Sequence, residues 1–168
     1  MKNQEFIISV PINQITVLLA EDHAFFRKSL KLLVELEGDL KVVGEAKNGS
    51  EAVRLNRSLQ PEVIIMDIAM PIMNGLQATR QIIETSPHTR VLMLSANPDP
   101  EYIERAIFFG ASGYLIKQSS TQFLAKAIRE VLKGNTYFST SISRELRDQC
   151  QIVFGRGESL KKKMARVG

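Results

Sequence analysis

Five short apolar runs rich in β-branched residues recur along the chain. They cover residues 15–20, 41–46, 63–67, 91–95 and 113–117. Runs of this length and composition are typical of buried β-strands. Successive runs start 22 to 28 residues apart, which leaves room for one helix and its two loops between each pair. The pattern therefore predicts five strands that alternate with helices.

The segments between the runs have helical spacing and helix-ending signals. In residues 24–37, Phe25, Leu32 and Leu36 recur at helical spacing. Asn48 offers a cap for the second helix, and Gly110 offers a C-terminal cap for the fourth. The five helices are expected over 24–37, 51–59, from 75 to about 86, 100–109 and 121–133.

Strands that are almost continuously apolar and alternate with helices favour a parallel sheet covered on both faces. The predicted fold is therefore a doubly wound α/β domain. We expect an N-terminal extension at residues 1–12, one domain over 13–138, and a C-terminal tail over 139–168 that forms one helix and a solvated end. A length of 168 residues with 44% hydrophobic positions suits one globular domain.

Cys150 is the single cysteine, so no intrachain disulfide is possible and a reducing, cytoplasmic location is expected. We expect it to be a small apolar residue. The apolar stretch at residues 6–10 is too short for a signal peptide, and no run approaches the length of a membrane span.

The net charge of +4 lies entirely in the tail. Residues 1–138 carry 15 basic and 15 acidic residues, whereas residues 139–168 carry 7 basic and 3 acidic residues. A basic tail is more often a solvated segment than a reader of DNA, so we expect no DNA binding by this chain.

Polar residues follow four of the predicted strands. Glu21 and Asp22 end the first, Asp67 ends the third, Ser95 the fourth and Lys117 the fifth. Because the carboxyl ends of parallel strands meet at one edge, where such sheets bind ligands, these groups are expected to lie together. Core packing does not require such a set.

Phosphoryl transfer to a carboxylate is the chemistry these groups suit. Three crowded carboxylates repel one another, and a hard divalent cation with oxygen ligands, Mg²⁺, relieves that repulsion. Asp67 would attack phosphorus, Lys117 would pair with a phosphoryl oxygen, and the Ser95 hydroxyl would donate to another.

The chain resembles the receiver domains of response regulators. The resemblance covers about residues 13–135 and rests on four motifs in order: Leu18-Leu19-Ala20-Glu21-Asp22-His23, Ile65-Met66-Asp67-Ile68-Ala69-Met70-Pro71-Ile72-Met73-Asn74-Gly75, Leu94-Ser95-Ala96 and Gly113-Tyr114-Leu115-Ile116-Lys117.

The resemblance implies a flavodoxin-like, five-stranded sheet of order 2-1-3-4-5. It also implies that a histidine kinase or phosphotransfer protein phosphorylates Asp67. The implied Mg²⁺ ligands are Glu21, Asp22, Asp67 and the backbone carbonyl of Ala69. Lys117 and Ser95 would hold the phosphoryl group, and Tyr114 would swing from an exposed to a buried rotamer when Ser95 moves. The altered surface would then bind a downstream protein partner.

Two departures from the family pattern matter. Many receivers have proline where this chain has Gln118. Members of the subfamily with C-terminal helix-turn-helix outputs often lack that proline, and Tyr137 and Phe138 also resemble that subfamily's linker. The 30 residues after Phe138 are too few for such an output, so we expect it to be absent. Ala69 cannot touch an attacking water, so the phosphoryl lifetime is expected to depend on this position.

Three functions stay open. The leading hypothesis is a stand-alone receiver that signals through protein contacts, with a homodimer possible. The second is a transcriptional regulator whose output is missing or whose tail contacts DNA. The third, a phosphatase of the haloacid dehalogenase type, needs an acid two residues after the nucleophile, where this chain has Ala69. His23 is expected to be a surface histidine near a helix start.

Overall fold

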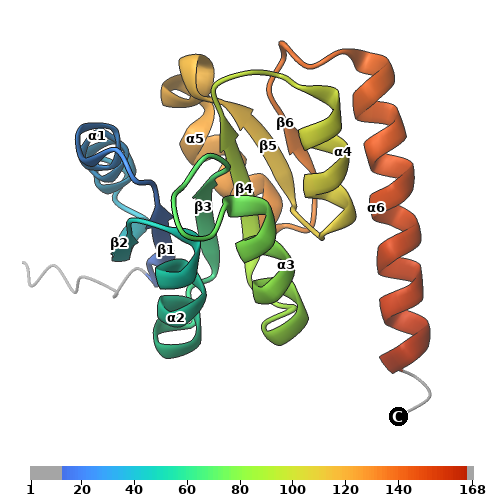
Figure 1. Cartoon of the computed structure of the whole chain (residues 1–168), viewed down its shortest axis with the longest axis horizontal. Coiled ribbons are helices and arrows are strands. Elements are labelled where there is room, and N and C mark those ends of the chain that lie inside the picture. Colours follow the sequence, from blue (N-terminus) through green and yellow to red (C-terminus); the bar gives the residue numbers. More distant parts are fainter. Residues whose placement is uncertain (1–12, 166–168) are drawn as a thin grey trace, which may run out of the picture.

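The structure is a computed structural model that describes the backbone of residues 13–165 and the side chains of residues 13–156. The N-terminal extension expected at 1–12 lies outside the described residues. Helices and strands alternate along the chain (Figure 1). In order they are β1 (Ile15–Ala20), α1 (Ala24–Glu35), β2 (Leu40–Ala46), α2 (Gly49–Leu59), β3 (Val63–Asp67), α3 (Gly75–Thr85), β4 (Arg90–Ser95), α4 (Pro100–Phe108), β5 (Gly113–Ile116), α5 (Lys117–Leu132), β6 (Tyr137–Phe138) and α6 (Arg144–Ala165).

The sheet is parallel throughout and has the order β2-β1-β3-β4-β5-β6. The predicted doubly wound fold and the order of its first five strands are confirmed. The difference is β6, which pairs with β5 and makes the sheet six-stranded. Its two residues, Tyr137 and Phe138, were interpreted from the sequence as part of a linker. A two-residue strand is too short for its apolar pattern to be recognised.

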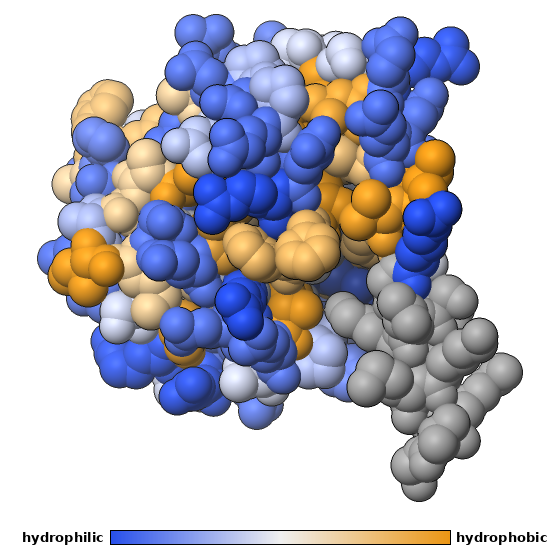
Figure 2. Space-filling view, turned by 45° about the vertical axis from the view of Figure 1, so that its right-hand side comes forward, coloured by the Kyte–Doolittle hydropathy of each residue, from blue (hydrophilic) through white to orange (hydrophobic). Residues whose placement is uncertain are grey.

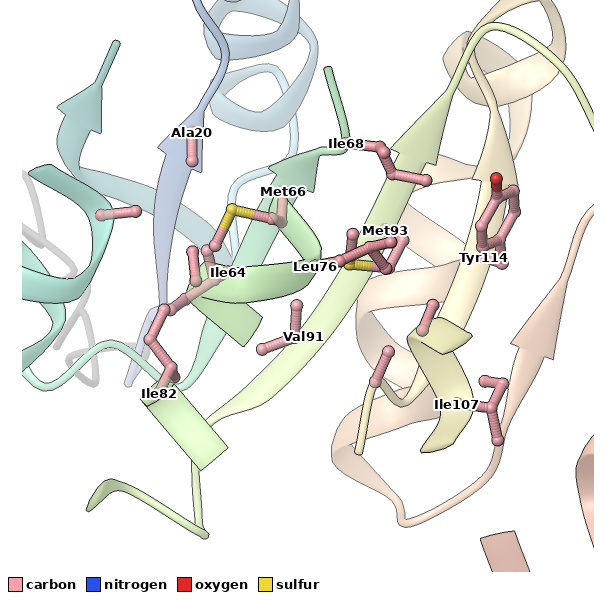
Figure 3. Close-up of a cluster of buried hydrophobic side chains, with 14 of the residues drawn as sticks. Ala20, Ile64, Met66, Ile68, Leu76, Ile82, Val91, Met93, Ile107 and Tyr114 are labelled. Atoms are coloured by element: carbon pink, nitrogen blue, oxygen red, sulfur yellow. The ribbon is translucent and has the colours of Figure 1, made fainter. Parts of the chain in front are cut away.

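Two separate apolar cores hold the layers together. α1 and α5 cover one face of the sheet, where Leu30, Leu115 and Leu124 are buried. α2, α3 and α4 cover the other face, and the buried cluster there includes Leu76, Met93 and Tyr114 (Figure 3). Side chains that alternate along each strand feed the two cores in turn. The strands are therefore apolar along their whole length, as a sheet buried on both faces requires.

Side-chain caps fix where α2, α3 and α4 begin. The Asn48 side chain accepts a hydrogen bond from the backbone N–H of Glu51, and Asp99 accepts one from Glu101. Asn74 and Gln77 form a reciprocal capping box at the start of α3. Gly110, at φ 95°, follows the end of α4 and takes a left-handed conformation that suits glycine. The three side-chain caps lie in loops at the carboxyl edge of the sheet, and Gly110 lies in a loop at the opposite edge.

The buried face of α1 differs from the one that its apolar spacing suggested. Phe25, Leu32 and Leu36 have the expected spacing, but they are 86%, 60% and 81% exposed. Leu30 and Val34 are buried instead. An apolar stripe shows that a helix forms, but the docking angle on the sheet decides which stripe is covered.

The C-terminal segment packs against α4. Ile142 and Cys150 are buried in the same cluster as Ile103 and Ile107 of α4, and Leu146 packs against it. α6 runs beside α4 at the edge of the domain (Figure 1). None of the helices in the described part of the chain is long and apolar enough to cross a membrane. The boundaries at residues 13, 138 and 139 stay predictions.

Candidate functional site

Three side chains from separate strands meet at the carboxyl edge of the sheet. Lys117 Nζ lies 2.8 Å from Glu21 Oε2 and 3.0 Å from Asp67 Oδ1. Glu21 is fully buried and Asp67 is 2% exposed. The sheet brings them together because β1, β3 and β5 run parallel and end at the same edge. The chain thus places one cation between two buried carboxylates that lie 46 positions apart in the sequence.

Asp67 is held in an electrostatically unfavourable setting. Burial raises the pKa of its carboxyl group, and the nearby Glu21 charge raises it further, while Lys117 acts in the opposite direction. Its second oxygen, Oδ2, is buried and accepts no well-formed hydrogen bond from any described residue, although the nearby backbone N–H of Ala69 lowers the pKa of this carboxyl group. An unpaired carboxylate oxygen in a buried site costs free energy. This oxygen of Asp67 can therefore accept a hydrogen bond or bind a cation that comes from outside the described residues.

Lys117 stays a cation although it is largely enclosed. Burial alone would lower its pKa, but the hydrogen bond to Glu21 and the charge of Asp67 outweigh burial and raise it. The ammonium also lies 4.9 Å from the ring centre of Phe26 on α1. Because α5 begins at Lys117, directly after β5, the start of the helix fixes the direction of this side chain.

A second unpaired oxygen lies at the same edge. Asp22 Oδ1 is buried and accepts no hydrogen bond, although it lies 3.1 Å from His23 Nδ1. The same ring nitrogen lies 3.1 Å from Glu21 Oε1, so Glu21, Asp22 and His23 could hold a metal ion together. The His23 side chain is 72% exposed at the start of α1, as expected of a surface histidine.

The donor set fits a hard divalent cation. Unpaired oxygens on Asp22 and Asp67 flank the Glu21–Lys117 pair, and carboxylate oxygens are the ligands that Mg²⁺ prefers. Ala69 is exposed between the buried Ile68 and Met70 in the loop after β3, and its backbone N–H acts on the Asp67 carboxyl group. Receiver domains bind Mg²⁺ at an acidic pocket of this kind.

Two further residues support the site, and the sequence motifs did not single them out for a role. Arg27 of α1 is 8% exposed, and its Nη1 donates a 2.6 Å hydrogen bond to the carbonyl of Glu21, which fixes the loop after β1. Gly75 starts α3 so close to Asp67 that any Cβ would overlap the Asp67 carbonyl. Its N–H donates to the Ile68 carbonyl at 2.9 Å. The sequence carries no local signal for Arg27, because its burial depends on how α1 packs beside the end of β1.

Ser95 and Tyr114 lie apart from the ion-paired cluster. The Ser95 hydroxyl donates to the Asn97 carbonyl at 2.9 Å, so it is used within its own loop. Tyr114 is completely buried, and its hydroxyl points toward the same carbonyl at 3.5 Å. Burial raises the pKa of Tyr114 to about 12. The sequence allowed an exposed or half-buried Tyr114; the structure holds it inside.

The sequence of this chain is similar to those of known proteins. The family model described as the response regulator receiver domain matches residues 17–129. The transcriptional regulatory protein DegU of Brevibacillus brevis is 36% identical over 80% of this chain and 57% of its own length. The transcriptional regulatory protein YvfU of Bacillus subtilis is 36% identical over 88% of this chain and 74% of its own. The chain therefore spans little more than half of DegU.

Solved structures agree with the sequence comparisons. A LuxR-family two-component response regulator from Aurantimonas sp. SI85-9A1 superposes with a TM-score of 0.76 at 31% identity, covering 81% of this chain and 97% of that one. The signal receiver domain of the putative response regulator NarL from Mycobacterium tuberculosis gives a TM-score of 0.70 at 33% identity, covering 73% and 99%. The expected resemblance is thus confirmed, and the chain belongs to the response regulator receiver family of two-component systems.

Proposed function

We propose that Asp67 is the phosphoacceptor of this receiver and that Glu21, Asp22, Lys117 and Ser95 assist the transfer. One observation carries the proposal. Asp67 is buried at the carboxyl edge with one oxygen held by Lys117 and the other without a well-formed hydrogen bond from the residues that the structure describes. A residue kept only for stability would have both oxygens satisfied. The raised pKa of Asp67 supports the same conclusion, since strained titratable groups gather at functional sites.

The transfer forms one bond and breaks another. An Asp67 carboxylate oxygen bonds to phosphorus, and the bond from phosphorus to the leaving atom of the donor breaks. This atom is an oxygen in acetyl phosphate and a ring nitrogen in a phosphohistidine. With acetyl phosphate, acetate leaves; with a phosphohistidine, the imidazole leaves. Lys117 already lies 3.0 Å from Asp67, so its ammonium can pair with a phosphoryl oxygen without a large movement. No further enzymatic activity is proposed.

The proposed Mg²⁺ ligands are Asp22, Asp67, Glu21 and the Ala69 carbonyl. When bound, Mg²⁺ neutralises charge on the phosphoryl oxygens and on the crowded carboxylates. Glu21 has a second task in this structure, because its Oε2 accepts a hydrogen bond from Lys117. Arg27 supports the loop that carries the ligands through the Glu21 carbonyl.

Phosphorylation is proposed to change protein contacts through Ser95. The attached group would draw the Ser95 hydroxyl away from Asn97, which moves the loop between β4 and α4. A sensor histidine kinase or a phosphotransfer protein would supply the phosphoryl group, and a downstream protein would read the changed surface. The names of DegU and YvfU point to transcription, but that output belongs to those proteins. Salt-sensitive binding of this chain to duplex DNA would favour it here.

Intact mass spectrometry tests the proposal. The chain is incubated with Mg²⁺ and acetyl phosphate, and wild type is compared with Asp67→Ala and with Asp148→Ala, an exposed aspartate of α6. One phosphoryl adduct is expected in wild type and Asp148→Ala, and none in Asp67→Ala. A wild type without adduct, or an adduct that persists in Asp67→Ala, contradicts the proposal.

A second measurement concerns how long the phosphoryl group stays. Ala69 has no polar side chain to orient a water molecule toward phosphorus, so hydrolysis is expected to change in Ala69→Asn, whose amide can reach such a water. Loss of the adduct with time, followed by mass, gives the rate. An unchanged rate would remove this role from position 69.

A further inference from the structure

We infer that the C-terminal segment β6–α6 locks Tyr114 in its buried position, so that docking of this segment and phosphorylation favour the same state. The inference rests in part on the proposed function, because it takes Tyr114 as the switch residue. The first part of the inference, that β6 and α6 keep Tyr114 buried by covering β5 and α4, can be tested without phosphorylation.

The segment closes the edge of the sheet where Tyr114 lies. Phe138 of β6 is paired with Tyr114 of β5, and Tyr114 is paired with Met93 of β4. Paired residues of neighbouring strands point to the same face, and all three side chains belong to one buried cluster. With five strands Tyr114 would stand on an edge strand. With β6 in place it stands on an inner strand, between Met93 and Phe138.

Backbone and hydroxyl bonds fasten β6 next to the switch. Ser139 N–H donates to the Tyr114 carbonyl at 3.0 Å, and the Ser139 hydroxyl accepts from Ile116 N–H at 2.8 Å. Ser139 is 2% exposed, and Lys117 follows Ile116 directly. The tail is therefore bonded to both sides of the short stretch that carries Tyr114 and leads into Lys117.

Gly113 makes this close approach possible. A Cβ at this position would overlap the carbonyl oxygen of Tyr137. The φ of Gly113 is not among the positive values, so the backbone itself does not demand glycine here. Space for β6 is one reason that remains, and the nearby Leu92 side chain on β4 is the other. By contrast, a Cβ at Gly38 would meet nothing within 4 Å.

α6 holds the outer side of the same cluster. Leu146, Cys150 and Phe154 recur every four residues and belong to, or pack against, the buried cluster that contains Ile103 and Ile107 of α4 and Tyr114. The packing is incomplete: a hollow of about 430 Å³ lies between α4 and α6, lined by Phe108, Cys150 and Val153 among others. Figure 2 shows apolar side chains exposed on the face of the domain that includes α6. A partly packed helix can detach without unfolding the domain.

These contacts couple the tail to the switch. If the Tyr114 side chain swung outward, it would leave a void under α4. It would also need the space beside β5 that β6 and Phe138 occupy. Tyr114 is buried in this structure while Ser95 is still bonded to Asn97. Ser95 lies close enough to the Tyr114 hydroxyl to act against the burial that raises the pKa of Tyr114, so the tail and Ser95 together hold Tyr114. Because coupling is reciprocal, a phosphoryl group that favours buried Tyr114 also favours a docked tail.

Two probes in the full chain report the docking of α6 and the burial of Tyr114. Cys150 is the single cysteine and is 2% exposed, so its rate of labelling by a thiol reagent reports detachment of α6. Tyr114 is one of three tyrosines, so ¹⁹F NMR of the 3-fluorotyrosine-labelled chain, with Tyr114→Phe for assignment, reports its exposure to a soluble paramagnetic agent.

The first test needs no phosphoryl donor. Gly113→Ala displaces β6 and is compared with Gly38→Ala; Leu146→Asp detaches α6 and is compared with Ile152→Asp, an exposed residue of the same helix. Gly113→Ala and Leu146→Asp are expected to speed Cys150 labelling about tenfold and to expose Tyr114. The two controls are expected to behave as wild type. Faster labelling with Tyr114 still buried overturns the inference.

The second test adds acetyl phosphate and Mg²⁺ to wild type, with intact mass recorded on the same sample. Where the adduct forms, Cys150 labelling is expected to slow about fivefold. An adduct with unchanged or faster labelling overturns the coupling to phosphorylation. Absence of an adduct contradicts the proposed function alone, because the variants of the first test have already decided whether the tail holds Tyr114.

Discussion

α5 carries a cation at each end, and the two cations have opposite surroundings. Lys117, at the carboxyl edge of the sheet, lies between Glu21 and Asp67, and an oxygen of Asp67 accepts no well-formed hydrogen bond from the described residues. Arg129, in the last turn, donates to both oxygens of Asp39 at 2.9 and 2.6 Å and to Glu37 at 2.6 Å. Both cations join α5 to distant acidic residues, but only at Arg129 do both oxygens of the aspartate accept hydrogen bonds.

The two groups shift the pKa of an aspartate in opposite directions. The hydrogen bond from Arg129 lowers the pKa of Asp39, while burial and the charge of Glu21 raise that of Asp67. Each group joins one cation to two carboxylates, so the balance of charge is the same. The side chains of the Arg129 group are 37% to 41% exposed, and both oxygens of Asp39 accept hydrogen bonds, so this clip contributes stability. Glu21 and Asp67 are buried, which costs free energy, and this cost is retained at the end where chemistry is proposed. Burial of the excess negative charge, more than the presence of an ion pair, separates the functional end from the structural one.

The largest effect is expected from removing the Lys117 cation. Lys117→Ala should slow phosphorylation by acetyl phosphate about 100-fold, because one charged group that stabilises the transferring phosphoryl oxygens is lost. Lys117→Arg keeps the charge but changes its shape, and should recover part of the rate. The matched change at the other end, Arg129→Ala, should leave the rate unaltered. Equal losses in both alanine variants would erase the proposed difference between the two ends.

Neutralising the phosphoacceptor should stabilise the fold. Asp67→Asn removes a buried negative charge beside Glu21 and is expected to raise the free energy of unfolding by about 1 kcal/mol at pH 7 in a chelating buffer. Urea denaturation measures it. Asp39→Asn, at the other end, should lower the same free energy. If Asp67→Asn is destabilised as well, the site does not hold the electrostatic cost described above.

Breaking the Arg129 clip should have a smaller effect. Its side chain is 37% exposed, and so solvent screens the pair with Asp39. Arg129→Gln is expected to lower the free energy of unfolding by about 0.5 to 1 kcal/mol, with the loss shrinking in high salt. Arg80→Gln, which breaks an exposed pair with Glu84 inside α3, serves as control and should cost less. Urea denaturation at two ionic strengths separates them.

The smallest expected effects are opposite dependences on pH. The folded-state pKa of Asp39 lies below the ordinary 3.8, so its contribution is complete above that value and is lost as pH falls through the lower folded-state value. The folded-state pKa of Asp67 lies above 3.8, so stability falls as pH rises through the raised value. The free energy of unfolding is measured from pH 3 to 7. Arg129→Gln should lose the fall in stability toward low pH that Asp39 causes, and Asp67→Asn should lose the fall toward high pH that Asp67 causes. If both variants lose a pH dependence of the same sign, this assignment is contradicted.

The site could be found from the sequence because its members are tied to strand ends. Asp67 and Lys117 follow apolar strands directly, and parallel strands of a doubly wound sheet bring such ends to one edge. The same reasoning yields five strands and the helices between them. What it cannot yield is which oxygens remain unpaired, because that depends on distances between residues far apart in the chain, such as Glu21 and Lys117.

The sequence alone thus determined the parallel α/β fold and the composition of its carboxyl edge, since both follow from local periodicity and from the direction of the strands. Only the tertiary structure decided the rest. It buried Leu30 and left Phe25 exposed on α1, because the docking angle selects the covered stripe. It also placed β6 beside β5 and enclosed Tyr114, because packing between segments far apart, allowed by the missing side chain of Gly113, has no local signature.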